Sequence, residues 1–254
     1  MIEVVKIIRP AIFSKYKNLV CGVSTRFGPN SKPPLDFNLS FKVGDNPDYV
    51  RQNRNDFFDA LGIDEKKVTF QFQTHSTIHN YVEDTTFFKN SDALYTDKKD
   101  LYLSINIADC IPVFVYDPIN ELVAGIHSGW KGTKQKIVTH TLNTLIGKLG
   151  LNAGNSLAYI GPGISVAHFE VGKDVYELFD DEVKEIRDGK YYVDLKKDIY
   201  IQLLKIGFKT DNIEVSEYCS YEYKNLFHSY RRDKEKSGRM LGVIGLRNSN
   251  LRNV

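Results

Sequence analysis

The chain has few cysteines and few methionines, and each shortage excludes a class of protein. Its three cysteines, Cys21, Cys110 and Cys219, are odd in number and spread widely along 254 residues. They therefore do not suggest the paired framework of a small disulfide-rich domain. A reduced, cytoplasmic setting is the expectation that follows.

Long hydrophobic runs and strong net charge are also missing. No run approaches the ~20 apolar residues that a membrane span needs. Residues 1–16 are interrupted by charge and proline, which argues against a signal peptide. The formal net charge is only +2, too small to produce the field of a nucleic-acid-binding protein. We expect neither a membrane nor a nucleic acid as a partner.

The remaining composition is that of a globular protein, with 42% hydrophobic and 26% charged residues. Segments of strand and helix periodicity alternate, which predicts mixed sheets with helices outside them. Gly62, Gly150 and Gly207 stand where helices are expected to end. The helices are expected at 47–61, 134–149, 174–186 and 194–206. The strands are expected within 17–27, 68–82, 101–109, 111–116, 121–126, 156–160, 213–219 and 239–246.

Two of these strands place a thiol and an imidazole near each other. The runs 111–116 and 121–126 read as neighbouring strands, and Asp117 followed by Pro118 fits a type I turn. If the turn is centred just after Pro118, Cys110 and His127 lie directly opposite each other. Opposed Cβ atoms are ~4.5–5.5 Å apart. That spacing suits either a shared metal ion or a thiolate–imidazole pair.

A working metal site needs a third ligand, because zinc enzymes typically use three protein ligands and leave one position for water. His75 ends a strand-like run, from which it would project into a cleft, and His79 shares its parity. His140 falls between the apolar positions of a helix, and His168 and His228 fall in polar loops. On this pattern alone, either His75 or His79 could be the third metal ligand.

Short motifs follow one another in a specific order along nearly the whole chain. They include Gln73-Thr74-His75, Ser91-Asp92-Ala93-Leu94, Ala108-Asp109-Cys110-Ile111-Pro112, His127-Ser128-Gly129-Trp130-Lys131-Gly132-Thr133, Gly161-Pro162-Gly163-Ile164 and Ser229-Tyr230-Arg231-Arg232-Asp233 ahead of Gly238-Arg239. In this order they resemble the YfiH-like laccase-domain family. Three positions depart from the family: Ser76 and Pro29 stand where glycine is usual, and Ser220 stands where threonine is usual.

The resemblance implies a fold, a metal and an activity. The fold is α+β, a single domain over 1–254 with four α/β/β/α layers and mixed β-sheets. The family's zinc ligands, which are also its catalytic residues, map onto His75, Cys110 and His127. Family members phosphorolyse adenosine, inosine, guanosine and methylthioadenosine to the free base and ribose 1-phosphate, and they deaminate adenosine. Purine nucleosides and phosphate are therefore the expected partners, and zinc the expected cofactor.

Phosphorolysis requires groups that hold phosphate, ribose and base. Backbone N–H groups after Gly129 are candidates for an anion site because they precede a predicted helix. Zinc with an open position would also activate water for deamination, with Asp109 or Glu170 as proton shuttle. Arg54 is a candidate for binding phosphate or ribose. The residues proposed to bind substrate are Asn38, Gln73, Asp109, Trp130, Lys131, Arg26 and Arg231.

Three other functions remain open. Cys110 and His127 could act without metal as a Cys-His hydrolase or amidase, for example on peptidoglycan precursors. A copper-binding polyphenol oxidase is disfavoured by the six histidines and by methionines only at positions 1 and 240, because a blue-copper site uses a weak axial Met. The third is a zinc-stabilised binding protein without turnover, which is disfavoured because structural zinc sites usually have four protein ligands and the sequence offers three. The oligomeric state is expected to be a monomer or a small homo-oligomer.

Overall fold

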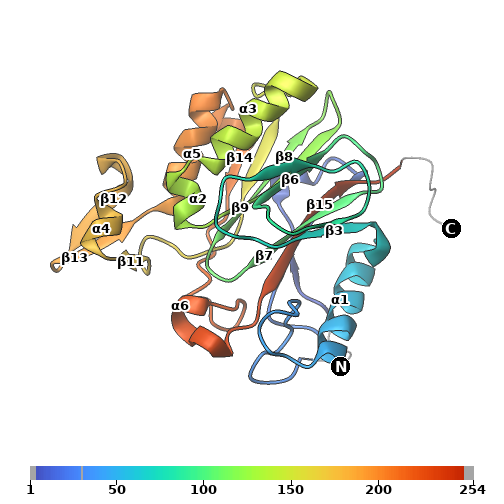
Figure 1. The fold of residues 1–254 in the computed structure, drawn as a ribbon, viewed down its shortest axis with the longest axis horizontal. Helices are drawn as coiled ribbons and strands as arrows, with labels where there is room; N and C mark the ends of the chain where they lie inside the picture. The colour runs from blue at the N-terminus through green and yellow to red at the C-terminus, as the bar shows by residue number, and fades with distance from the viewer. Residues whose placement is uncertain (1–3, 30, 249–254) are drawn as a thin grey trace.

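The computed structural model describes residues 4–29 and 31–248. Two six-stranded sheets form its centre (Figure 1). Both sheets contain parallel and antiparallel neighbours, as the mixed-sheet prediction requires. The first sheet has the order β1 (Ile7–Ile8), β2 (Leu19–Ser24), β15 (Met240–Leu246), β7 (Tyr102–Ile107), β3 (Val68–Gln71) and β5 (Phe87–Phe88). The second has the order β14 (Ile213–Val215), β10 (Leu157–Ile160), β8 (Ile111–Asp117), β9 (Leu122–Ser128), β6 (Ala93–Thr96) and β4 (His79–Tyr81).

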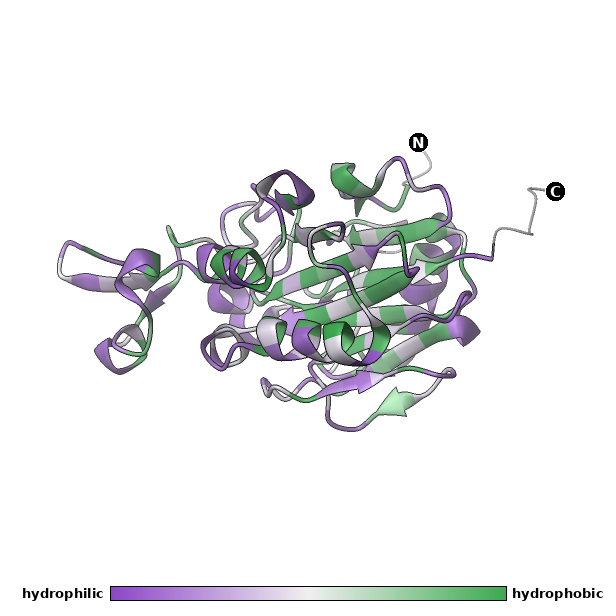
Figure 2. Ribbon diagram, turned by 90° about the horizontal axis from the view of Figure 1, so that it is seen from above, coloured by the Kyte–Doolittle hydropathy of each residue, from purple (hydrophilic) through white to green (hydrophobic). Residues whose placement is uncertain are grey.

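The sheets pack against each other and are covered by helices on their outer faces. Side chains such as Ile105, Phe114 and Ile244 fill the space between the sheets. Helix α1 (Pro47–Leu61) packs on the first sheet, while α3 (Ile137–Leu149) and α5 (Leu195–Ile206) pack on the second. Figure 2 shows the central strands as the most hydrophobic part of the chain. The expected α/β/β/α layering is confirmed.

Local sequence signals explain where the main helices begin and end. The side chain of Asn46 accepts a hydrogen bond from the N–H of Asp48, and Gly62 ends α1 in the left-handed region. Asp194 caps α5 through the N–H of Lys197, and Gly207 ends it in the left-handed region as well. These boundaries match those predicted from sequence. Among the described residues, no helix combines the length and the apolar character needed to cross a membrane.

Two predicted helices differ from the structure. The 174–186 segment forms only the short α4 (Lys173–Tyr176) before it turns into β12 (Lys184–Arg187) and β13 (Lys190–Val193). Asp188 and Gly189 both have positive φ, as the tight turn of a β-hairpin requires. With β11 (Glu170–Val171) these strands form a third sheet that projects from the body (Figures 1 and 2).

The second difference concerns the 134–149 helix, which starts later than predicted. Lys136 adopts the left-handed region and separates α2 (Trp130–Lys134) from α3. The remaining short helices are α6 (Tyr230–Asp233) and the 3₁₀ turns Ala11–Phe13, Glu65–Lys67, Asp181–Val183, Thr210–Asn212 and Lys234–Lys236.

Candidate metal centre and its cavity

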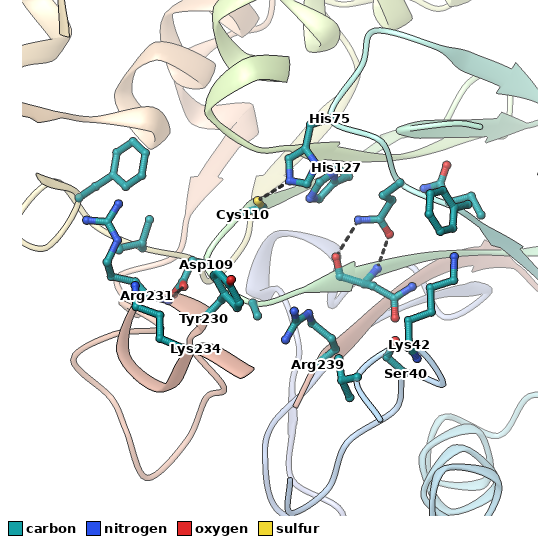
Figure 3. Close-up of a pocket in the computed structure, with 18 residues that line it drawn as sticks. Ser40, Lys42, His75, Asp109, Cys110, His127, Tyr230, Arg231, Lys234 and Arg239 are labelled. Carbon is teal, nitrogen blue, oxygen red and sulfur yellow. Dashed lines mark hydrogen bonds between the residues drawn. The ribbon is translucent and has the colours of Figure 1, made fainter. Parts of the chain in front are cut away.

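Three segments that are distant in sequence bring two imidazoles and a thiol together (Figure 3). His75 lies in the loop after β3, Cys110 directly precedes β8, and His127 lies in β9. Their ligand atoms all lie within 4.8 Å of one another. The Sγ atom of Cys110 is 3.7 Å from Nε2 of His75. The structure thus selects His75 over His79, whose ring bonds to Thr144 instead.

The register that was expected to join Cys110 and His127 is wrong. His127 pairs with Pro112, and the last pair before the turn is Asp117 with Leu122. The turn therefore has four residues instead of two. Because the side-chain period of a strand is 2, Cys110 keeps the parity of Pro112. Cys110 and His127 are diagonal neighbours on one face instead of direct partners, and both still reach the same centre.

A single buried carboxylate positions two of the three ligands. Asp92, which has no exposed surface, accepts a hydrogen bond from Nδ1 of His127 at 2.8 Å and from the N–H of His75 at 3.0 Å. It also accepts from the N–H and hydroxyl of Ser76, both at 2.7 Å. Burial alone would raise the pKa of Asp92, but these bonds outweigh it and lower the pKa well below the usual range. The departure to Ser76 thus adds a hydrogen bond to the carboxylate.

The Cys110 thiol and the His127 imidazole shift each other's pKa in the direction that favours a thiolate and an imidazolium. Burial would raise the pKa of the Cys110 thiol, but the His127 charge and hydrogen bonds from both imidazoles lower it to about 6. Burial would lower the pKa of His127, but the Cys110 thiolate and Asp92 raise it to about 9. Between these values the thiol is a thiolate, the form in which cysteine binds metals.

Space for an ion is kept by Gly129, which follows β9. A Cβ atom at this position would lie 2.8 Å from Sγ of Cys110 and 2.8 Å from Cδ2 of His75. Only glycine therefore leaves the centre open. Two imidazoles and one thiolate, with Nδ1 of His127 held by a carboxylate, match the ligands and outer contacts of catalytic zinc. The residues present fit a zinc ion.

The centre opens into a cavity of about 760 Å³. Four cationic side chains line it, Lys42, Arg231, Lys234 and Arg239, and one carboxyl group, Asp109. Figure 3 shows the four cationic side chains apart from His75, Cys110 and His127, whereas Asp109 lies near Cys110. None of the four cations forms an ion pair with a carboxylate of the described residues. The cavity therefore presents uncompensated positive charge next to a candidate metal ion.

Aromatic side chains form the apolar part of the wall. Phe72 and Tyr230 are 42% and 44% exposed and both face the cavity. Lys42 lies above the Phe72 ring, with Nζ 3.2 Å from its centre. Exposed rings of this size offer stacking surfaces for a planar ligand.

Three of the seven predicted substrate-binding residues line the cavity, Gln73, Asp109 and Arg231. The amide of Gln73 is bonded to the backbone N–H and C=O of Asn106. Asp109, at φ +84°, accepts from the hydroxyl of Ser220 and the N–H of Arg231, both at 2.7 Å. These two side chains shape the wall, whereas the guanidinium of Arg231 donates to the carbonyl of Glu170 and adds charge.

The other four predicted residues lie outside the cavity lining. Arg26 is bonded to Asp36 and to a backbone carbonyl. Asn38 is buried, and its Oδ1 accepts from the N–H of Arg239, so it positions a residue that does line the cavity. Trp130 packs beside the core of the second sheet. The Nζ of Lys131 lies 5.6 Å from the centre of the Trp130 ring.

The remaining acid and arginine candidates are also engaged elsewhere. Glu170 pairs with Lys190 at 3.0 Å. Arg54 donates to the carbonyl of Leu39 and lies over the Phe70 ring.

Several residues that line the cavity were not predicted from the sequence. Arg239 stands in the Gly-Arg motif ahead of the last strand, and this motif could have identified it as a candidate cavity residue. Lys42 lies in a loop and Lys234 begins a 3₁₀ turn, so neither carries a periodic signal. Phe72 falls in the strand-like run at 68–82, but that periodicity does not show that its ring faces a cavity. Asp92 stands in a motif that the sequence shows, but its contact with His127 arises only in the tertiary structure.

Comparison with known proteins agrees with the fold and the motifs. A family model described as multi-copper polyphenol oxidoreductase laccase matches residues 20–247. The chain is 33% identical to a purine nucleoside phosphorylase of Bacteroides thetaiotaomicron, over 91% of this chain and 93% of that one. It is 32% identical to the purine nucleoside phosphorylase YlmD of Bacillus subtilis, over 91% of this chain and 90% of that one.

Solved structures show the same arrangement. The crystal structure of YfiH from Bacillus licheniformis has a TM-score of 0.87 at 33% identity, covering 92% of this chain and 94% of that one. YlmD from Geobacillus stearothermophilus also has a TM-score of 0.87, at 27% identity, covering 97% of this chain and 100% of that one. The chain therefore belongs to the multi-copper polyphenol oxidoreductase laccase family, together with the YfiH and YlmD proteins.

Proposed function

We propose that the protein is a zinc-dependent purine nucleoside phosphorylase. It would convert adenosine, inosine, guanosine or methylthioadenosine, with phosphate, to the free base and ribose 1-phosphate. The observation that carries this proposal is one cavity with metal ligands on one side and four unpaired cations on the other. The names of the relatives from Bacteroides thetaiotaomicron and Bacillus subtilis support the same reaction class.

The cations suit the phosphate co-substrate. In phosphorolysis a phosphate oxygen forms a bond to C1′ of the ribose while the bond from C1′ to the purine nitrogen breaks, and the electron pair leaves with the base. Arg239 and Arg231 can bind phosphate oxygens through their guanidinium groups, and Lys42 and Lys234 add point charges. Their role is to hold the anion close to the sugar and offset its charge.

The aromatic wall suits the purine. Phe72 and Tyr230 can stack on a planar base, as aromatic side chains do in many nucleic-acid-binding proteins. A cavity of about 760 Å³ is within the range of small-molecule sites. It has room for a nucleoside and a phosphate ion together.

His75, Cys110 and His127 would hold the zinc ion. Bound there, it would supply a Lewis acid to the cavity. We include adenosine deamination as a second reaction of the same centre. Among the residues lining the cavity, Asp109 is the one carboxylic acid. Both of its oxygens accept hydrogen bonds, so proton transfer through it would require one of these bonds to break.

Metal analysis combined with a phosphate-dependent assay tests the proposal. The protein is loaded with zinc, its metal content is measured, and it is given inosine or adenosine with and without phosphate. The expected result is release of hypoxanthine or adenine that requires phosphate. Failure to release base from any purine nucleoside, by a fully metallated sample, would reject the proposal.

One observation favours a second candidate, a metal-free Cys-His hydrolase or amidase. Cys110, His127 and Asp92 form a nucleophile–base–carboxylate series, and the lowered pKa of Cys110 makes it a thiolate near neutral pH. Peptidoglycan precursors or other amides would then be substrates. Zinc would bind the thiolate and so inhibit a metal-free hydrolase, whereas it would activate the phosphorylase. The effect of added zinc on activity therefore distinguishes the two candidates.

Copper binding by the same ligands remains compatible with the donor set, but a blue-copper site is not supported. The sulfur of Met240 is fully buried and accepts a hydrogen bond from the N–H of His228, and Met240 does not line the cavity.

We further propose a cytoplasmic monomer or small homo-oligomer acting on small molecules. Cys21 and Cys219 are free buried thiols, as expected in a reducing compartment. Light scattering would determine the oligomeric state.

A further inference from the structure

A second group of metal-type ligands lies outside the catalytic cavity. The ligand atoms of His168, Cys219 and Glu222 all lie within 4.8 Å of one another. None of the three lines the cavity that holds the first centre. We propose that these residues form a second metal site, which takes Zn²⁺. The site is independent of the reaction proposed above.

Two hydrogen-bonded turns hold the ligands in place. The N–H of Tyr223 donates to the carbonyl of Cys219 at 3.0 Å, which closes the turn that carries both Cys219 and Glu222. The N–H of His168 donates to the carbonyl of Ser165 at 3.0 Å, which closes the turn that carries the imidazole. Each turn therefore presents its ligands without needing the ion to fold it.

The two turns are also joined to each other. The N–H of Ser220 donates to the carbonyl of Gly163 at 3.0 Å, and Gly163 forms a β-bridge with Cys219. The N–H of Ser165 donates to Sγ of Cys219 at 3.3 Å. The backbone thus fixes the thiol beside the imidazole-bearing turn.

The side chains leave room for an ion. Nε2 of His168 is 3.9 Å from Oε2 of Glu222, which is too long for a hydrogen bond. Tetrahedral zinc with bonds of about 2.0–2.3 Å sets neighbouring ligand atoms roughly 3.3–3.5 Å apart, so a shift of about 0.5 Å would bring His168 and Glu222 to that spacing. The His168 ring stacks on Tyr221, with centres 4.6 Å apart. The Ser165 hydroxyl oxygen is buried and has no hydrogen-bond partner within the described residues.

Charge and ligand type favour zinc over magnesium or calcium. A thiolate and a carboxylate together neutralise a divalent ion, and the neutral imidazole adds a nitrogen. Sulfur and nitrogen ligands select zinc, whereas magnesium and calcium prefer oxygen alone. The side chains of His168 and Glu222 are 32% and 61% exposed, so an ion can enter from solvent while Cys219 remains buried.

The second site adjoins a wall of the catalytic cavity. Ser220, which follows Cys219, donates its hydroxyl to Asp109. Asp109 in turn accepts the N–H of Arg231 in α6. An ion bound at Cys219 would therefore stabilise the turn that anchors α6. The three protein ligands would leave the fourth position of the ion to solvent, and the ion would act at a distance from the reacting atoms.

Zinc stoichiometry tests the proposal directly. Wild-type protein and the variants H168A, E222Q and C219S are equilibrated with Zn²⁺, desalted, and analysed for metal. Wild type is expected to retain one equivalent more than H168A or C219S. H140A, which removes an exposed histidine from α3, and C21S, which removes another buried thiol, are the matched controls and should retain the wild-type amount.

A second measurement keeps the test valid if C219S folds poorly. In a C110S background the catalytic thiol is gone, so any cobalt–thiolate charge-transfer band in Co²⁺-loaded protein reports Cys219. The band should be present in C110S and lost in C110S/H168A. Equal zinc content in wild type and H168A, or no thiolate band in C110S, would overturn the proposal. Neither readout uses a nucleoside, so failure of the phosphorylase proposal would leave this result unchanged.

Discussion

Nδ1 of His127 lies 2.8 Å from Oδ1 of Asp92, and this contact determines which ring nitrogen faces the cavity. With Nδ1 donating to the carboxylate, Nε2 is free to bind a metal ion. The same oxygen accepts the N–H of His75. One buried side chain, placed directly before β6, therefore orients ligands from two separate segments.

Replacing Asp92 with asparagine should weaken the metal centre and the fold together. The asparagine side chain would place an NH₂ donor next to the N–H groups of His75 and Ser76, which now donate to the Asp92 carboxylate. Loss of an outer-shell carboxylate typically lowers metal affinity 10–100-fold, and breaking a buried charged pair destabilises by about 3 kcal/mol. Zinc affinity and the free energy of unfolding of D92N, measured by competition with a chelator and by urea denaturation, check both effects.

The matched control for Asp92 is S76A. It removes one hydroxyl donor but keeps the Ser76 N–H bond and all contacts to His127. The expected loss of stability is about 1 kcal/mol, with zinc affinity close to that of wild type. If S76A lost as much zinc affinity as D92N, the assigned role of the His127 contact would be wrong.

Gly129→Ala should block the centre without disturbing the backbone. Gly129 has φ −77°, which alanine adopts readily, but the new Cβ would lie 2.8 Å from the sulfur of Cys110. We expect G129A to fold and to lose most of its zinc, as measured by elemental analysis. The control is G147A in α3, where a Cβ meets nothing within 4 Å. That variant should keep its zinc and gain up to about 1 kcal/mol of stability.

The cavity cations should control the affinity for phosphate. Lys42→Gln removes an exposed charge that has no carboxylate partner among the described residues. Loss of one charged contact of about 1.5 kcal/mol raises KM for phosphate about 10-fold, while KM for inosine changes little. Lys148→Gln, an exposed lysine near the end of α3, is the control. An unchanged phosphate KM in both K42Q and R239Q would place the anion elsewhere.

The thiol of Cys110 should titrate near pH 6 in metal-free protein. Its pKa is lowered to about 6, chiefly by the neighbouring His127, whose own pKa is raised to about 9. The ion pair stabilises the fold between these values. Its contribution is lost as pH falls through about 6, where the thiolate is protonated, and as pH rises through about 9, where the imidazolium loses its proton.

Alkylation rates of chelator-treated protein as a function of pH measure this titration, because Cys21 and Cys219 are buried. The midpoint should rise in H127Q, which removes the imidazolium. A wild-type midpoint close to 9, the ordinary value for a thiol, would show that the ion pair does not form.

The parts of the fold that could be predicted from sequence are those governed by local signals. Asn46 and Gly62 define α1, and Asp194 and Gly207 define α5, because caps act over a few residues. The helix predicted at 174–186 was wrong for a related reason. The Asp188-Gly189 turn signal lies just after it, and apolar spacing was given more weight than that signal.

The candidate site shows the same division between local and tertiary information. The three candidate metal ligands stand in readable motifs. The predicted turn was too short by one residue on each strand, and this error still left Cys110 and His127 on the same face of the sheet. The cationic wall was not predictable in the same way. Lys42 and Arg239 line the same cavity because their two loops are joined by the bond between Asn38 and Arg239, which are 201 positions apart in the chain.

The most direct test is the stoichiometry of the products. Zinc-loaded protein is incubated with inosine and phosphate, and hypoxanthine and ribose 1-phosphate are quantified by chromatography and phosphorus NMR, with C110S alongside. We expect equal amounts of the two products from wild type and almost none from C110S. Hypoxanthine released with free ribose instead of ribose 1-phosphate, or full activity in C110S, would contradict a metal-dependent phosphorylase.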